Sequence, residues 1–108
     1  MKGSVEEKIL TRHPLGKRGL NVSKRKYETV RRAILAALRR KPLTHTELVA
    51  QLRQGLERTF SGNVSWYAET VKLDLEARGR IERTTSRPQR YRLKIKRTRP
   101  AGYERTTP

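Results

Sequence analysis

The residue types that carry out catalysis are scarce in this sequence and are poorly spaced for it. Cysteine is absent, which excludes thiol nucleophiles, disulfide bonds and thiolate metal sites. The two histidines, His13 and His45, stand far apart in the chain, and each is interpreted as a lone side chain rather than a metal ligand. Among Glu69, Asp74 and Glu76, helical spacing places only the two glutamates on one face, with no nucleophile or base beside them. We therefore expect no enzyme activity, no metal and no cofactor.

The glycine-rich stretch Gly16-Lys17-Arg18-Gly19 invites comparison with a phosphate-binding loop. Such a loop needs a spaced first glycine and a Ser or Thr after the lysine, and both are missing here. The chemistry that the chain does offer is positive charge, with 27 Lys and Arg against 10 Asp and Glu in 108 residues and a formal net charge of +17. This excess predicts a polyanionic partner, which is most often nucleic acid.

The charge is distributed unevenly along the chain. Residues 1–41 carry a net charge of +10 and residues 78–108 carry +9, whereas residues 42–77 carry a net charge of −2. The sequence contains neither a run of 18 apolar residues nor the apolar core of a signal peptide. We therefore expect a cytoplasmic protein with no membrane partner, cationic at both ends and weakly acidic in the middle.

Two helices are predicted in the first half of the chain. Apolar residues at three- and four-residue intervals begin after Ser23, the expected N-cap, and Pro42 marks the end of this first helix. Thr44 and Glu47 form a capping box for a second helix, which is expected to end near Arg58.

A third helix and a hairpin complete the predicted fold. The helix runs from Val64 to Arg78 and stops at Gly79, and a period of two then predicts strands over residues 81–84 and 90–96. The fold class is thus mainly α with a small β-hairpin, an α+β arrangement.

The folded domain is expected to span residues 23–96. Residues 1–22 are predicted to be a basic, mostly irregular arm in which Ser4 and Glu7 could cap a short helical turn. Residues 97–108, rich in Arg, Thr and Pro, are predicted to be a disordered basic tail.

The third helix has apolar residues on two faces. Val64 and Tyr67 fall on one of them, and Trp66 and Leu73 fall nearly opposite. Such a helix is either wedged between neighbours or has one face that awaits a partner. Trp66, Tyr67 and also Tyr91 are interpreted as core residues, with stacking on nucleic-acid bases as the alternative for the first two.

Two stretches of the chain carry a resemblance to a known fold: Val71–Arg83, which passes from a helix through Gly79 into a strand, and Pro88–Leu93. With the order of elements, they make residues 23–96 similar to the winged helix-turn-helix domain of many bacterial regulators, in which three helices precede a two- or three-stranded wing. The chain also resembles a family of small bacterial winged-helix proteins of unknown function. The motifs that carry this second resemblance are His13-Pro14, Gly16-Lys17-Arg18-Gly19, Lys26-Tyr27 and Trp66-Tyr67.

The resemblance implies that the third helix enters the major groove of duplex DNA and that the wing lies along the backbone. Ser65, Glu69 and Lys72 would then face base edges. Cations of the wing and of the first helix would contact phosphates, namely Arg87, Arg90, Arg92, Lys94, Lys96, Lys24 and Arg25. The third helix carries a net charge of −1, however, which favours recognition of the backbone or of DNA shape over sequence readout.

We therefore expect a nucleic-acid-binding protein, a transcriptional regulator or an architectural protein, that contacts the backbone of duplex DNA. Two alternatives stay open: a protein-interaction module that docks through Trp66, Leu73 and Ala77, and an RNA-binding protein. Burial of both Trp66 and Leu73 would exclude docking through this face. A monomer is expected, with a weak dimer as the alternative, and no small-molecule effector is expected because the chain has no room for an effector domain.

Overall fold

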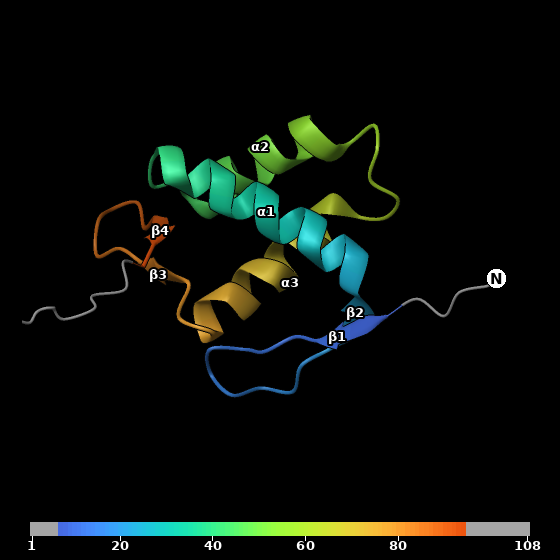
Figure 1. Cartoon of the computed structure of the whole chain (residues 1–108). Helices are drawn as coiled ribbons and strands as arrows, with labels where there is room; N and C mark the ends of the chain where they lie inside the picture. The colour runs from blue at the N-terminus through green and yellow to red at the C-terminus, as the bar shows by residue number, and fades with distance from the viewer. Residues whose placement is uncertain (1–6, 95–108) are drawn as a thin grey trace, which may run out of the picture.

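The computed structural model describes residues 7–94, in which three helices are flanked by a short antiparallel strand pair on each side in sequence (Figure 1). The elements follow in the order β1 (Lys8–Leu10), β2 (Asn21–Ser23), α1 (Lys24–Arg40), α2 (His45–Leu56), α3 (Val64–Ala77), β3 (Ile81–Arg83) and β4 (Tyr91–Leu93). This is the mixed α+β class that the sequence predicts. No helix in the described range is both long enough and apolar enough to cross a membrane.

A capping side chain begins each of the three helices, and for α1 and α2 it is the one that the sequence predicts. Ser23 Oγ accepts a hydrogen bond of 3.3 Å from the backbone N–H three residues further on. Thr44 and Glu47 exchange the two hydrogen bonds of a capping box, and Asn63 Oδ1 accepts from the N–H of Trp66 at 2.9 Å. These bonds satisfy backbone donors that the first turn of a helix leaves unpaired.

The helices end close to the predicted positions. α2 stops at Leu56, two residues before the predicted end at Arg58. α3 stops at Ala77, and Gly79, where the sequence predicts the helix to stop, follows with φ of 76°, a left-handed conformation that favours glycine.

The hydrophobic core lies where the three helices meet. Their inward faces supply most of its buried side chains, which include Val30, Ile34, Leu38, Leu48, Leu52, Ala68, Val71 and Leu75. The link between α1 and α2 also takes part, because Leu43 and Tyr91 exchange backbone hydrogen bonds of 3.1 and 2.7 Å. This bridge attaches a third extended segment to β4 and fixes the C-terminal hairpin (residues 80–94) against the core.

The C-terminal hairpin is antiparallel, with Glu82 opposite Arg92. Its second strand is shorter than the predicted strand over residues 90–96. Residues 95–108, and with them Lys96 and the predicted tail, lie outside the described residues.

The N-terminal segment differs from the sequence prediction. Where an irregular arm is predicted, β1 and β2 pair antiparallel with Ile9 opposite Val22, and we call residues 8–23 the N-terminal hairpin. Ser4, the predicted cap of a helical turn, lies outside the described residues, and the residues expected to continue that turn form β1. The physical reason is burial, since Val22 is only 4% exposed and joins the core.

Gly19 allows the N-terminal hairpin to close. Thr11 N–H donates to the carbonyl oxygen of Leu20 at 2.9 Å, and Leu20 N–H donates to Thr11 Oγ1 at 3.0 Å. A Cβ atom on Gly19 would lie 1.7 Å from the carbonyl oxygen of Thr11, so no larger residue fits without moving the backbone. The glycine-rich stretch that fails as a phosphate loop therefore has a structural role.

Candidate nucleic-acid interface

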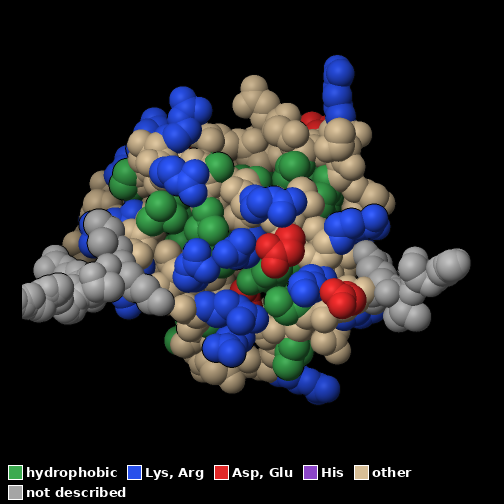
Figure 2. Space-filling view, in the orientation of Figure 1, with side chains coloured by type: hydrophobic (Ala, Val, Ile, Leu, Met, Phe, Trp, Pro, Cys, Tyr) green, Lys and Arg blue, Asp and Glu red, His purple; other side chains and the backbone are tan. Residues whose placement is uncertain are grey.

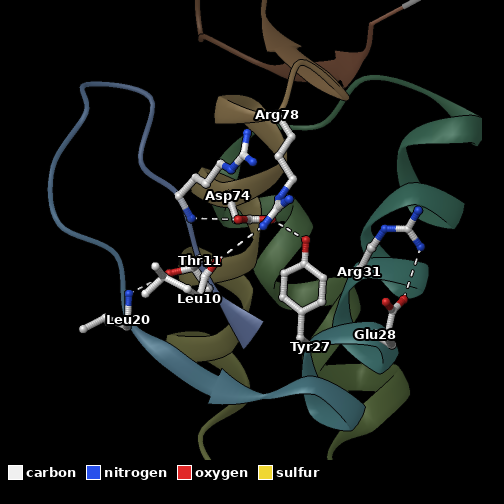
Figure 3. A network of polar contacts seen from close by, with 9 residues as sticks. Leu10, Thr11, Leu20, Tyr27, Glu28, Arg31, Asp74 and Arg78 are labelled. Atoms are coloured by element: carbon white, nitrogen blue, oxygen red, sulfur yellow. Dashed lines mark hydrogen bonds and ion pairs between the residues drawn. The ribbon is translucent and has the colours of Figure 1, made fainter. Parts of the chain in front are cut away.

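The C-terminal half of α3 is fastened to the N-terminal hairpin by one buried carboxylate (Figure 3). Asp74 is fully buried. Its Oδ1 accepts from the backbone N–H of Arg12 at 2.7 Å, and its Oδ2 accepts from Arg78 Nε at 2.8 Å and from the hydroxyl of Tyr27. Arg78 in turn donates to the carbonyl oxygen of Leu10 at 3.4 Å. Asp74 thus joins α1, α3 and the N-terminal hairpin at one point.

The electrostatics of this network explain how a carboxylate is tolerated in the core. Arg78 supplies the opposite charge, and its hydrogen bond to Asp74 raises the pKa of the guanidinium. Burial, with the hydrogen bond to Asp74, raises the pKa of Tyr27 to about 12. Sequence reasoning missed this role, although the spacing of Asp74 and Arg78 by four residues on a helix was a signal for the pair.

The cations predicted to contact phosphates on the C-terminal hairpin differ in their pairing. Arg87 and Lys94 are exposed and have no carboxylate partner among the described residues. Arg90 is half-buried, with its guanidinium 3.5 Å from the carbonyl oxygen of Pro88. Arg92, in contrast, is held by Glu82 at 2.8 Å, so part of its charge is already balanced.

A second set of cations lies on and beside the N-terminal hairpin, where sequence reasoning assigned no site. Lys8, Arg12, Lys17 and Arg18 are all exposed. The loop that carries three of them passes beside the C-terminal end of α3 in Figure 1, on a different side from β3 and β4. The signal for these residues was the basic composition of the segment, and its paired strands give that charge a fixed place.

The two predicted phosphate contacts on α1 lie at its first turn. Lys24 is exposed and pairs with Glu7 at 3.4 Å. Arg25 is exposed and lines a cavity with Lys26 and Phe60. Figure 2 shows Lys and Arg side chains spread over the face formed by α1 and the N-terminal hairpin, with few Asp and Glu side chains between them.

Lys72 does not face outward as the resemblance implies. It is 4% exposed, and its Nζ lies 3.0 Å from His45 Nδ1 and 3.1 Å from the hydroxyl of Tyr91. The ammonium also stands over the Tyr91 ring, 4.2 Å from its centroid. Lys72, which was predicted to contact bases, therefore links α3 to α2 and β4 instead. The hydroxyl and the ring of Tyr91 together compensate its buried charge.

The other two residues predicted to face base edges are placed less deeply. Ser65 is half-buried and Glu69 is exposed, with its carboxylate 3.9 Å from His45 Nε2. Burial, and then the charge of Lys72, lower the pKa of His45 below its ordinary value, against a smaller opposing effect of Glu69. The stripe of α3 assigned to base reading thus packs toward α2 and β4, and its one exposed member is a carboxylate.

The aromatic residues divide between core and surface. Tyr91 is buried, as predicted, and Tyr67 is half-buried against the core. Trp66 is not the core residue that its spacing predicts, because 43% of its surface is exposed. Leu73 is partly exposed as well, so burial does not exclude docking through this face of α3.

The comparisons with known proteins point to one family. The model of the "Family of unknown function (DUF6958)" matches residues 8–91, from the first residue of β1 to the first residue of β4. No curated protein and no solved structure gives a significant match. Among the described residues, no group of three or more His, Cys, Asp or Glu side chains is placed to hold a metal ion.

Proposed function

The chain belongs to the family of unknown function DUF6958, and we propose that it is a winged-helix protein that binds duplex DNA through the phosphate backbone. The observation that carries this proposal is the set of unpaired cations on the C-terminal hairpin, Arg87 and Lys94 above all. Cations without acidic partners can neutralise phosphates without first breaking an ion pair, and the counterions that they release favour binding.

The element order supports the winged-helix arrangement. Three helices lead directly into the C-terminal hairpin, and the bridge between Leu43 and Tyr91 adds an extended segment beside β4. In a winged helix-turn-helix domain the hairpin is the wing, and α3 is the helix presented to the major groove.

The charges on α3 favour backbone contact over sequence readout. With Lys72 withdrawn into the core, the exposed charge near the middle of the helix is the carboxylate of Glu69. A carboxylate in a groove walled by phosphates is repelled. The affinity for DNA must therefore come from the segments that flank α3.

The N-terminal hairpin supplies a second basic segment beside α3. Its anchor at Asp74 fixes Arg12 relative to the C-terminal end of α3, while Lys17 and Arg18 lie on its loop. Basic segments on two sides of one helix can contact both strands that border a groove, which is a geometry for binding DNA without reading bases. This favours an architectural or general regulatory role, and we propose the cytoplasm as its location.

The test compares two double variants that remove the same charge. Arg87→Ala/Arg90→Ala changes the C-terminal hairpin, and Arg53→Ala/Arg58→Ala changes exposed arginines of α2 and the turn after it. Affinity for a blunt DNA duplex of mixed sequence is measured over a range of salt concentrations. If both hairpin arginines contact phosphates, the slope of log K against log salt becomes shallower by about 1.8 in the first variant only.

Two results would overturn the proposal. One is equal loss of affinity in the two double variants, which would assign binding to net charge alone. The other is affinity that does not depend on salt. A duplex RNA of the same sequence, titrated in parallel, separates DNA recognition from RNA binding, because the A-form helix presents a different groove geometry.

A further inference from the structure

A cavity of about 410 Å³ opens between the first turns of α1 and the segment that joins α2 to α3. It lies near the N-terminal end of α3, whereas β3 and β4 follow the C-terminal end of that helix (Figure 1). Its lining combines two cations, three hydroxyl groups and one aromatic ring, from Arg25, Lys26, Thr29, Thr59, Ser61 and Phe60. The Thr29 hydroxyl donates to the carbonyl oxygen of Arg25 at 3.0 Å, which leaves the hydroxyls of Thr59 and Ser61 as donors. Cations with hydroxyl donors suit a phosphate, and an aromatic ring suits a nucleic-acid base.

A row of three aromatic rings leads from this cavity to the surface. The centroids of Phe60 and Tyr67 are 5.1 Å apart, and those of Tyr67 and Trp66 are 5.0 Å apart, each pair in edge-to-face geometry. Lys26 Nζ lies 6.0 Å from the centroid of Phe60 and 5.9 Å from that of Tyr67. A positive charge is therefore held beside the row, at the side where the cavity opens.

Trp66 ends the row with an accessible ring. The core residues of this protein are at most 9% exposed, whereas 43% of Trp66 is exposed. Its backbone is fixed, because its N–H donates to the Asn63 side chain that caps α3. The protein thus presents an accessible aromatic ring close to a cationic cavity.

We propose that this end of the molecule binds an unpaired nucleotide, with a phosphate in the cavity between Arg25 and Lys26 and a base stacked on Trp66. The site is separate from the C-terminal hairpin, whose unpaired cations carry the proposal of duplex binding, and it lies next to the end of the N-terminal hairpin. It gives the protein a preference for DNA that carries a single-stranded end or gap, since both sites are then filled by one nucleic acid. Stacking on an aromatic side chain tolerates any base, so the preference is for strand form and not for sequence.

The experiment uses the intrinsic fluorescence of the full chain, because Trp66 is the one tryptophan in the sequence. The probes are an oligothymidylate, an abasic oligonucleotide of the same length and charge, and inorganic phosphate. Oligothymidylate is expected to quench the fluorescence of Trp66 and to bind roughly tenfold more tightly than the abasic strand. Inorganic phosphate is expected to leave the fluorescence unchanged.

Two variants and one matched control locate the site. Lys26→Ala is expected to weaken binding of oligothymidylate severalfold, whereas Arg53→Ala, which removes the same charge from the exposed face of α2, leaves it close to the original value. Trp66→Leu removes the only tryptophan, so its binding is measured by the anisotropy of labelled oligonucleotides, and this variant is expected to lose the preference for oligothymidylate over the abasic strand. Circular dichroism confirms that each variant is folded.

The inference is overturned if the abasic strand binds as tightly as oligothymidylate, or if Lys26→Ala and Arg53→Ala have the same effect. Its failure is distinguishable from failure of duplex binding. Arg87→Ala/Arg90→Ala is expected to change the salt dependence of duplex affinity while leaving the quenching by oligothymidylate intact.

Discussion

Replacement of Asp74 by alanine is expected to destabilise the protein more than any surface charge substitution. The carboxylate accepts three hydrogen bonds, from Arg12 N–H, Arg78 Nε and the Tyr27 hydroxyl. Hydrogen bonds to a charged group contribute about 1.5 to 3 kcal/mol each. Part of this is recovered in the variant, because the Arg78 side chain is 29% exposed and can be solvated.

The Tyr27 hydroxyl, in contrast, cannot be solvated. The residue is 3% exposed, so its hydroxyl is left buried without an acceptor, at a cost of about 1 to 3 kcal/mol. Together with the loss of the buried ion pair, the free energy of unfolding is expected to fall by about 3 to 5 kcal/mol. Small domains have about 5 to 15 kcal/mol in total, so Asp74→Ala brings the protein near its limit of stability.

Urea denaturation followed by circular dichroism measures this change. The control is Glu82→Ala, which breaks the exposed ion pair with Arg92 and is expected to cost less than about 1 kcal/mol. Hydrogen exchange adds a local readout, because the amide of Thr11, bonded to Leu20, should lose protection before the amides of the helices. A loss for Asp74→Ala no larger than for Glu82→Ala would refute the assignment of Asp74 as the link between α1, α3 and the N-terminal hairpin.

Three further predictions concern single side chains. The pKa of Tyr27 is raised to about 12 in the folded protein, whereas this group ionises near 10.0 in the unfolded chain. Its contribution to the free energy of unfolding is therefore complete below pH 10 and falls by about 3 kcal/mol as the pH rises to 12. Tyr27→Phe should lack this fall in urea titrations at different pH values, and an alkaline slope equal to that of the original protein would contradict the cause given. The pKa of His45 is lowered from 6.5, so on acidification the imidazole is protonated in the unfolded chain before it is protonated in the folded protein, and the free energy of unfolding should fall as the pH drops below about 6.5. His45→Gln should make the free energy of unfolding depend less on pH in this range, and an unchanged pH dependence would contradict the prediction. Gly19→Ala should disrupt the N-terminal hairpin, because its Cβ would collide with the Thr11 carbonyl oxygen; amide exchange at Thr11 is the measurement, and retained protection would rule out the close approach.

Features set by neighbouring residues were predictable from the sequence. The Thr44 and Glu47 capping box and the helix end at Gly79 both depend on contacts within one helical turn. The alternation around Tyr91 likewise identified the strand that packs on the core. The α+β class follows from these local signals.

Features set by distant residues were not predictable in the same way. The strands of the N-terminal hairpin have three residues each, too short for a periodic signal, and the hairpin is held by a residue 62 positions away in the chain. Lys72 shares its helical stripe with exposed Glu69, and only the docking of β4 places the Tyr91 hydroxyl within reach of its ammonium. For Trp66, helical spacing identifies the face but not whether a neighbour covers it.

The position of Asp74 in the chain also sets an order of events when the protein is made. The N-terminal hairpin is synthesised first, but its acceptor on α3 follows Arg12 by 62 residues. At about 5 to 20 residues per second, Asp74 leaves the ribosome about 3 to 12 seconds after Arg12. Since an isolated two-stranded hairpin is marginally stable in water, the first basic segment to be synthesised is among the last to take its folded position.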